Sequence, residues 1–269
     1  MKKFLYLLGW ILAIFWVIIG ILFKLLKITT MYARHIKDKT LYTLEQRQNL
    51  VSKTISMALY MFRVKTVATG FEKLPNKPTL FVFNHKSNLD ALAILKTFYL
   101  YNKKNENKVY INLIVKHSLN KKKNVIYKAL VLLDCFFLER DNPRSILQMY
   151  NKEIEFINEK HSLCLSPEGT RIYNDTFGEF KSPALKIAYT KYLPIVPIIV
   201  YGSSGLFDSN KQYVKPGRTI YLKALTPIQP QKFVDCEINA FANTLKDDMY
   251  QQYLQISKNP QKLLPNPKA

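Results

Sequence analysis

The longest apolar stretch of the chain lies near its amino end, where residues 4–23 include no charged side chain. At a rise of about 1.5 Å per residue, a helix of roughly 20 residues crosses a hydrocarbon core of ~30 Å. A secretory signal peptide has a shorter apolar region, typically ~7–15 residues, and ends at a small-residue cleavage site. This run ends instead in Phe23-Lys24-Leu25-Leu26-Lys27, which offers no such site. We therefore expect an uncleaved membrane anchor over residues 1–27.

A second apolar pattern follows at residues 44–62. Its hydrophobic positions fall near one helical face, and they include Leu50, Ile55, Ala58, Leu59 and Phe62. Such a helix could pack on a folded domain, or it could lie on the bilayer surface beside the anchor. The sequence leaves both interpretations open for this amphipathic linker, which we place at residues 28–63.

Short runs rich in Val, Ile and Phe then alternate with helical patterns as far as residue 257. Strands are expected at 79–83, 109–115, 135–138, 162–165, 195–201 and 219–225, and helices near 90–101, 124–133, 143–160, 183–192 and 239–256. This order predicts a single α/β domain over 64–257, with a mixed, largely parallel sheet flanked by helices. The tail over 258–269 is basic and rich in proline, and we expect it to be loosely ordered.

Charge adds a strong basic bias. Lys and Arg number 40 against 19 Asp and Glu, a formal net charge of +21 that is spread along the chain. A soluble protein this basic suggests nucleic acid, whereas a membrane-attached one suggests anionic head groups, phosphorylated substrates or an acidic carrier protein. Composition alone does not choose among these partners.

The flanks of the apolar run and the cysteines both bear on the compartment. Only Lys2 and Lys3 precede the run, whereas the basic residues that follow are Lys24, Lys27, Arg34, Lys37 and Lys39. The positive-inside bias therefore keeps the folded domain in the cytoplasm, on the inner side of the cell membrane. Three scattered cysteines, without a C-x-x-C pair, agree with a reducing compartment and argue against structural zinc. Neither common nucleotide-binding loop, G-x-x-x-x-G-K-[ST] or G-x-G-x-x-G, occurs.

Candidate chemistry begins directly after the first of these strands. His85 follows the apolar run 80–83, and Asp90 lies five residues further on, where a helix is expected to begin. In its first turn, Asp90 could accept a hydrogen bond from one imidazole nitrogen and so prepare the other nitrogen to take a proton from a substrate hydroxyl. The plainer alternative is a polar turn residue followed by an acid at a helix start.

Two further strand ends carry an arginine. Glu139-Arg140 closes the strand at 135–138, and Ser166-Pro167-Glu168-Gly169-Thr170-Arg171 follows the strand at 162–165. Arginine can hold a phosphate with two parallel hydrogen bonds, and a glycine lets backbone N–H groups approach an anion closely. A single arginine is more often a surface residue, but three polar turns at strand ends of one domain favour a common site.

These motifs, taken together, resemble a known family. N-H-x-x-x-x-D at Asn84, His85 and Asp90 is similar to the first sequence block of the 1-acylglycerol-3-phosphate acyltransferases, within the wider glycerolipid acyltransferase family. The other blocks match at residues 137–140, 167–171 and 193–198, and Lys116 falls where the family commonly has lysine. The chain departs from the pattern at Asp134, Ser166 and Pro183, which stand where a Gly, a Phe and a Gly are usual.

The resemblance implies transfer of a fatty acyl group from acyl-CoA or acyl carrier protein to the free hydroxyl of lysophosphatidate, giving phosphatidic acid for phospholipid synthesis. It implies that His85 is the general base and that Asp90 orients it. It also implies that the acceptor phosphate is held by the following residues: Arg140, Glu168, Gly169, Thr170, Arg171 and Lys116. Within this set, Glu168 is expected to organise the loop or to contact the acceptor hydroxyl rather than to act as a second base.

By the same resemblance we expect no metal, no bound cofactor and no nucleic acid partner, with membrane lipids and the carrier protein as the remaining candidates. One alternative is an acyltransferase with another acceptor, such as glycerol-3-phosphate or a different lysophospholipid. The other is a non-catalytic basic protein that binds membranes or nucleic acid.

Overall fold

A seven-stranded sheet forms the centre of the protein in a computed structural model that describes residues 2–139, 142–205 and 217–263, with side chains from residue 13 on except that of residue 262. The strands are β1 (Lys65–Thr69), β2 (Leu80–Phe83), β3 (Ile111–Lys116), β4 (Phe136–Leu138), β5 (Ser162–Leu165), β6 (Ile195–Tyr201) and β7 (Thr219–Ala224). Their order is β1-β7-β6-β2-β5-β3-β4, and only the β6–β7 pair is antiparallel among these strands. The predicted mixed, largely parallel sheet is confirmed.

Each expected strand is present, and β1 is the one the sequence pattern missed. Its residues, Lys-Thr-Val-Ala-Thr, are at most half-buried, because β1 lies at the sheet edge and pairs only with β7. The central strands β2 and β5 are buried at every residue, as expected for strands that are covered on both faces.

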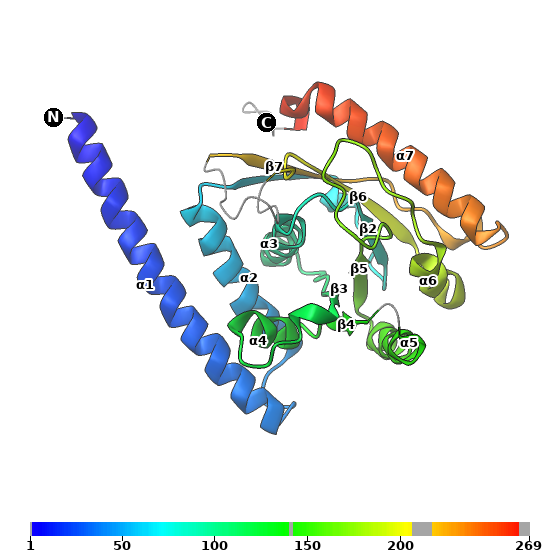
Figure 1. Ribbon diagram of the computed structural model, residues 1–269, viewed down its shortest axis with the longest axis horizontal. Helices are drawn as coiled ribbons and strands as arrows, with labels where there is room; N and C mark the ends of the chain where they lie inside the picture. Colours follow the sequence, from blue (N-terminus) through cyan, green and yellow to red (C-terminus); the bar gives the residue numbers. More distant parts are fainter. Residues whose placement is uncertain (1, 140–141, 206–216, 264–269) are drawn as a thin grey trace.

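Helices cover both faces of the sheet, and residue alternation along the strands assigns each side chain to one of them (Figure 1). Phe81 and Phe83 face the core under α3 (Leu89–Lys104), α2 (Leu44–Met61) and α4 (Val125–Leu132). Leu80 and Val82 face the opposite core, under α5 (Pro143–Asn158), α6 (Lys186–Lys191) and α7 (Ile238–Lys258). Short 3₁₀ turns complete the described chain: η1 (Phe71–Lys73), η2 (His117–Leu119), η3 (Ser182–Leu185), η4 (Pro230–Lys232) and η5 (Pro260–Leu263).

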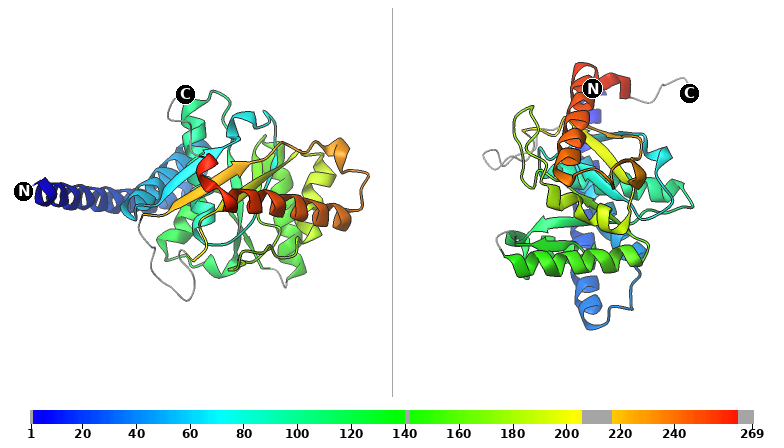
Figure 2. Two further views of the ribbon diagram at one scale, coloured as in Figure 1. Left: turned by 90° about the horizontal axis from the view of Figure 1, so that it is seen from above. Right: turned by 90° about the vertical axis from the view of Figure 1, so that its right-hand side faces the viewer.

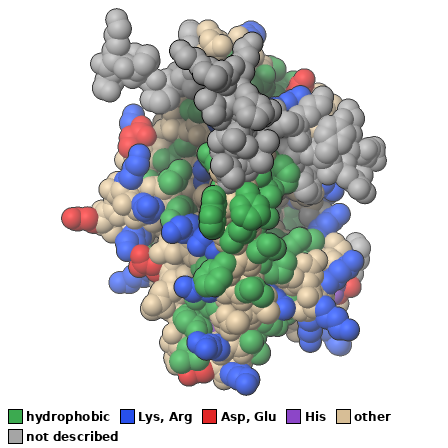
Figure 3. Space-filling view, turned by 90° about the vertical axis from the view of Figure 1, so that its left-hand side faces the viewer, with side chains coloured by type: hydrophobic (Ala, Val, Ile, Leu, Met, Phe, Trp, Pro, Cys, Tyr) green, Lys and Arg blue, Asp and Glu red, His purple; other side chains and the backbone are tan. Residues whose placement is uncertain are grey.

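The apolar amino-terminal run forms the first part of α1 (Lys2–Lys37), which continues without a break past residue 27. Within the described chain it is the one helix long and apolar enough to cross a membrane. Its amino-terminal part projects from the domain (Figure 2), and large side chains of the apolar run are exposed, such as Trp16 at 68% and Phe23 at 70%. Figure 3 shows hydrophobic side chains gathered on this side of the molecule with basic side chains around them. Ile28 and Met31, nearer the carboxyl end of the helix, are buried against the domain.

Helix α2 lies between α1 and α3 (Figure 1) and contacts both. Of the two interpretations of residues 44–62, packing on the folded domain therefore describes these contacts. Thr43 and Gln46 form a reciprocal capping box that satisfies backbone groups at its start. Leu50, Val51 and Leu59 are buried, whereas Tyr60, at its carboxyl end, is exposed. The helix therefore joins the amino-terminal helix to the folded domain.

Candidate active site

The site begins at the carboxyl end of β2, where Asn84 fixes the path of the chain. Its side chain is fully buried and makes two hydrogen bonds to β6: the amide donates to the Val200 carbonyl at 2.9 Å, and the Val200 N–H donates to Asn84 Oδ1 at 2.8 Å. The amide of Asn84 thus makes the pair of hydrogen bonds to a neighbouring strand that a backbone would make, one residue beyond the end of β2. The turn that carries His85 therefore starts from a fixed point in the centre of the sheet.

His85 and Asp90 form the hydrogen bond that their spacing suggested, with Nδ1 2.9 Å from Oδ2. The same Asp90 oxygen accepts the backbone N–H groups of Lys86 at 2.6 Å and Ser87 at 2.8 Å, and the residue has no exposed surface. Because a carboxylate only accepts, Nδ1 carries the proton, and Nε2 is left with a free lone pair. The His85 side chain is 23% exposed. A buried, fixed carboxylate thus orients an accessible imidazole.

Glu168 links the β5 turn to this histidine. One carboxylate oxygen accepts the His85 N–H at 2.6 Å, and the other accepts the Gly178 N–H at 3.1 Å. Burial raises the pKa of the Glu168 carboxyl, and the two N–H donors and Lys86 partly offset that effect. The His85 carbonyl in turn accepts the Ile172 N–H at 2.9 Å. Both oxygens of Glu168 therefore hold backbone groups, which suits an organiser of the loop.

The turn after β5 is tight at Gly169, whose φ of 65° lies in the left-handed region that glycine adopts without strain. Its N–H donates to the Ser166 carbonyl at 3.1 Å. Thr170 next to it is exposed, and Arg171 is half-buried with its guanidinium 5.5 Å from the centre of the Tyr173 ring. The loop thus presents polar groups at the rim of the site.

A further basic candidate, Lys116, lies along the same edge of the sheet. Parallel strands β2, β5, β3 and β4 bring their carboxyl ends to one side, and Lys116 ends β3 as an exposed side chain. With neighbouring strands about 4.8 Å apart, Lys116 lies roughly 10 Å along the edge from His85. Arg140 lies outside the described residues. The roles expected for these basic residues in phosphate binding stay predictions.

Asp134, one of the departures from the family pattern, adopts the conformation that a glycine would. Its φ is 54°, a left-handed value that Asp tolerates better than most residues. Its carboxylate binds the Arg47 guanidinium through two hydrogen bonds of 2.7 and 2.8 Å, and Arg47 also donates to the Leu132 carbonyl at 2.9 Å. Here the side chain that replaces glycine gains an ion pair between α2 and the turn before β4.

One residue that sequence reasoning passed over is Lys86, directly after the candidate base. It is 1% exposed, and its ammonium contacts carbonyls and aromatic rings that are distant in the sequence. No local pattern distinguishes this lysine from a surface one, because every partner of the ammonium comes from another part of the fold.

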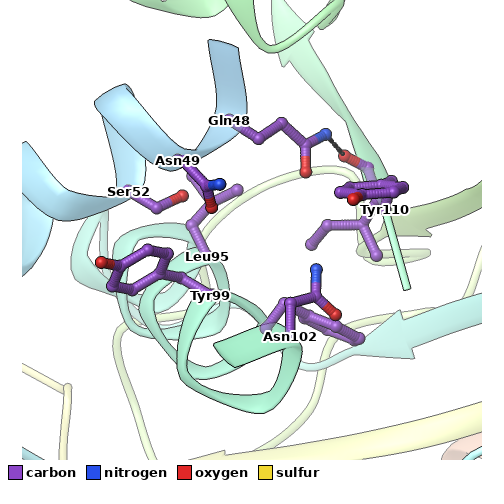
Figure 4. Close-up of a pocket in the computed structure, with 9 residues that line it drawn as sticks. Gln48, Asn49, Ser52, Leu95, Tyr99, Asn102 and Tyr110 are labelled. Carbon is purple, nitrogen blue, oxygen red and sulfur yellow. Dashed lines mark hydrogen bonds between the residues drawn. The ribbon is translucent and has the colours of Figure 1, made fainter. Parts of the chain in front are cut away.

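A small cavity of about 10 Å³ lies away from this site, between α2, α3 and the start of β3. Figure 4 shows Gln48, Asn49 and Tyr110 at its rim, with Gln48 donating a hydrogen bond of 2.9 Å to the Ile111 carbonyl. It adjoins the amino end of β3, which is the opposite edge of the sheet from His85. The cavity therefore takes no part in the site described above.

Known proteins resemble the chain in both sequence and fold. The acyltransferase family model matches residues 65–201. A probable 1-acyl-sn-glycerol-3-phosphate acyltransferase of Mycoplasma pneumoniae is 35% identical, over 81% of this chain and 82% of that protein. The 1-acyl-sn-glycerol-3-phosphate acyltransferase of Saccharomyces cerevisiae is 27% identical, over 82% of this chain and 72% of that protein.

The fold also matches a crystal structure. The 1-acyl-sn-glycerophosphate acyltransferase of Thermotoga maritima superposes with a TM-score of 0.65 at 18% identity, covering 90% of this chain and 98% of that one. The resemblance expected from the sequence blocks is confirmed, and the alternative of a non-catalytic binding protein is set aside. The chain belongs to the acyltransferase family.

Proposed function

We propose that the protein transfers a fatty acyl group from an acyl thioester to the free hydroxyl of 1-acyl-glycerol-3-phosphate, giving phosphatidic acid for phospholipid synthesis. The relatives named above support the acceptor. The observation that carries the proposal is the His85–Asp90 pair, in which a fully buried carboxylate holds Nδ1 at 2.9 Å and is itself held by two backbone N–H groups.

In this mechanism, Nε2 of His85 takes the proton of the acceptor hydroxyl as its oxygen attacks the thioester carbonyl. Asp90 stabilises the imidazolium that forms, without taking the proton itself. When the tetrahedral intermediate collapses, the carbon–sulfur bond breaks and the departing thiolate takes the proton back from Nε2. The ester and the free thiol are the products, and no covalent intermediate on the protein is needed.

The phosphate of the acceptor is assigned to three basic residues that end or follow strands in the sequence. Arg171 follows the Glu168–Gly169–Thr170 turn, Lys116 ends β3, and Arg140 follows β4 in the sequence. Arginine suits a phosphate because its planar guanidinium offers two parallel donors. Glu168 acts indirectly in this scheme, because both of its oxygens hold backbone groups.

The exposed apolar part of α1 would bring the enzyme to its substrate, since both the acceptor and the product are lipids. The excess of basic residues after the apolar run, compared with Lys2 and Lys3 before it, favours attachment to the cell membrane with the domain on the cytoplasmic side. The donor is acyl-CoA or acyl carrier protein, and the basic surface is complementary to either acidic molecule. Neither a bound cofactor nor a metal is part of this mechanism.

The test compares two histidine variants of the full chain in detergent, measured by thiol release with 1-acyl-glycerol-3-phosphate and acyl-CoA. His85→Ala should lower acyl transfer by at least ~10²-fold, the scale of lost general-base catalysis. His161→Ala is the matched control, because its side chain is similarly exposed, 21% against 23%, but lies at the amino end of β5. Near-normal transfer by a folded His85→Ala variant would refute the proposal.

The acceptor is tested separately with a panel that includes glycerol-3-phosphate and a lysophospholipid with a larger head group. We expect 1-acyl-glycerol-3-phosphate to give the highest kcat/KM. Arg171→Gln should raise the apparent KM for this acceptor and leave the KM for the donor unchanged. A preference for glycerol-3-phosphate or for the larger head group would replace the proposed acceptor with that one.

A further inference from the structure

Lys86 carries a charge into the interior beside the candidate base. Its ammonium donates to the carbonyl of Asn174 at 2.9 Å and to the carbonyl of Thr176. It also lies 5.1 Å from the centre of the Phe177 ring and 5.4 Å from that of Tyr253. Burying an ammonium is costly, and an apolar side chain of the same length would fill the space at a lower cost. The charge therefore serves something other than packing.

The two carbonyls belong to a loop, residues 172–178, that has no regular secondary structure in the described chain. Both ends of the loop are tied to His85: Ile172 N–H donates to its carbonyl at 2.9 Å, and Gly178 N–H donates to Glu168, which also accepts the His85 N–H. Lys86 ties the middle of the same loop. The adjacent residues His85 and Lys86 thus hold the loop at both ends and in the middle, at the Gly178 end through Glu168.

Helix α7 supports the outer side of this loop, which passes beside it in Figure 1. The Tyr253 hydroxyl donates to Asp175 Oδ1 at 3.1 Å. The Phe177 ring lies 5.3 Å from the rings of Tyr250 and Tyr253. Lys86 is therefore enclosed between the loop and the helix. Burial lowers the pKa of its ammonium, and the nearby carboxylates of Glu168, Asp175 and Asp90 oppose that shift and favour the charged form.

We propose that Lys86 is a positioning residue for the acceptor site: its buried ammonium holds the 172–178 loop so that Arg171, the residue directly before that loop, meets the acceptor phosphate. Tyr253 of α7 completes this arrangement from outside the matched family region. The role in acceptor binding rests on the function proposed above. Lys86 acts through Arg171 and does not touch the reacting atoms.

The kinetic test uses Lys86→Met, which keeps the length of the side chain and removes the charge, and Lys86→Gln, whose amide still donates hydrogen bonds. In Lys86→Met, the carbonyls of Asn174 and Thr176 lose their charged donor and the loop loses its central contact, so the apparent KM for the acceptor should rise by about tenfold or more. The donor KM and the pH profile of kcat should stay as in the wild type. The acceptor KM of Lys86→Gln should lie between those of the wild type and Lys86→Met. Lys103→Met is the matched control, because that exposed lysine lies 5.9 Å from the Tyr99 ring at the end of α3. An unchanged acceptor KM in Lys86→Met, or an equal rise in both KM values, would overturn the proposal.

A second measurement does not depend on the reaction. Amide hydrogen exchange should be faster in Lys86→Met across residues 172–178, with no change in the buried strand β6. Unchanged exchange in the loop would show that Lys86 does not hold it, whatever the enzyme acylates. A wild-type enzyme that fails to acylate 1-acyl-glycerol-3-phosphate would instead refute the proposed function and leave the exchange result to decide the role of Lys86.

Discussion

Replacing Asp90 with asparagine separates the charge of this residue from its shape. Asp90 Oδ2 accepts three hydrogen bonds, from His85 Nδ1 and from the N–H groups of Lys86 and Ser87. The other oxygen, Oδ1, is buried and has no hydrogen-bond partner among the described residues. In Asp90→Asn the amide oxygen can keep all three bonds, because all three donors point at the Oδ2 position.

Two effects follow from that geometry. The new NH₂ group takes the place of Oδ1, where it finds no acceptor, so the free energy of unfolding should fall by about 1–3 kcal/mol. The imidazolium of His85 loses its negative partner, so kcat for acyl transfer should fall by about 10²–10⁴-fold. The fall in kcat reflects the lost charge and not a lost hydrogen bond.

The assay pairs thiol-release kinetics with urea unfolding, and Asp90→Ala serves as the comparison. Asp90→Ala loses all three accepted hydrogen bonds, so it should unfold at a lower urea concentration than Asp90→Asn. The kcat for acyl transfer should be low in both variants. Near wild-type kcat in a folded Asp90→Asn variant would refute the role given to the carboxylate. Equal stability of the two variants would refute the hydrogen-bond geometry.

Two further predictions concern stability. Arg47→Met should lower the free energy of unfolding by about 2–3 kcal/mol, less than for a fully buried pair because the Asp134 side chain is one-third exposed. Urea unfolding of Arg47→Met, Asp134→Asn and the double variant checks this, since additive losses would show that the two side chains do not interact. Burial raises the pKa of the Glu153 carboxyl from 4.5 to about 8, so the folded protein binds this proton more tightly than the unfolded chain does. The stabilisation that results is complete below pH 4.5 and is lost as the pH rises towards 8. Relative to Glu153→Gln, the wild type should therefore lose up to about 1.4 kcal/mol per pH unit across that window, whereas parallel stability profiles would contradict the shift.

The sequence predicted the centre of the fold better than its edges. Central strands such as β2 and β6 are continuous apolar runs, because helices cover both of their faces. Strand β1 has no such run, since it is an edge strand of the described sheet and its partner β7 lies far along the chain. The carboxyl end of α1 was also missed, because an apolar run marks the part that leaves the domain and not the part that packs on it.

In the candidate site, contacts between residues close in the sequence could be predicted, and contacts between distant residues could not. His85 and Asp90 are close in the sequence, so their spacing on a turn and a helix start suggested the hydrogen bond that the structure contains. The contacts of Lys86 with Asn174 and Thr176 span 88 and 90 residues, and no local pattern encodes them. Arg140, expected at the same edge, lies outside the described residues.

The pairing of β1 with β7 has a consequence for folding during synthesis, because the two strands leave the ribosome at different times. β1 ends at Thr69 and its partner strand in the described sheet begins at Thr219, so 219 − 69 = 150 residues must be added before the pair can form. At about 5–20 residues per second, this takes roughly 8–30 s on the ribosome. Helix α1 leaves the ribosome before any strand does, so it can meet a membrane while the β1 edge of the sheet still lacks its partner strand.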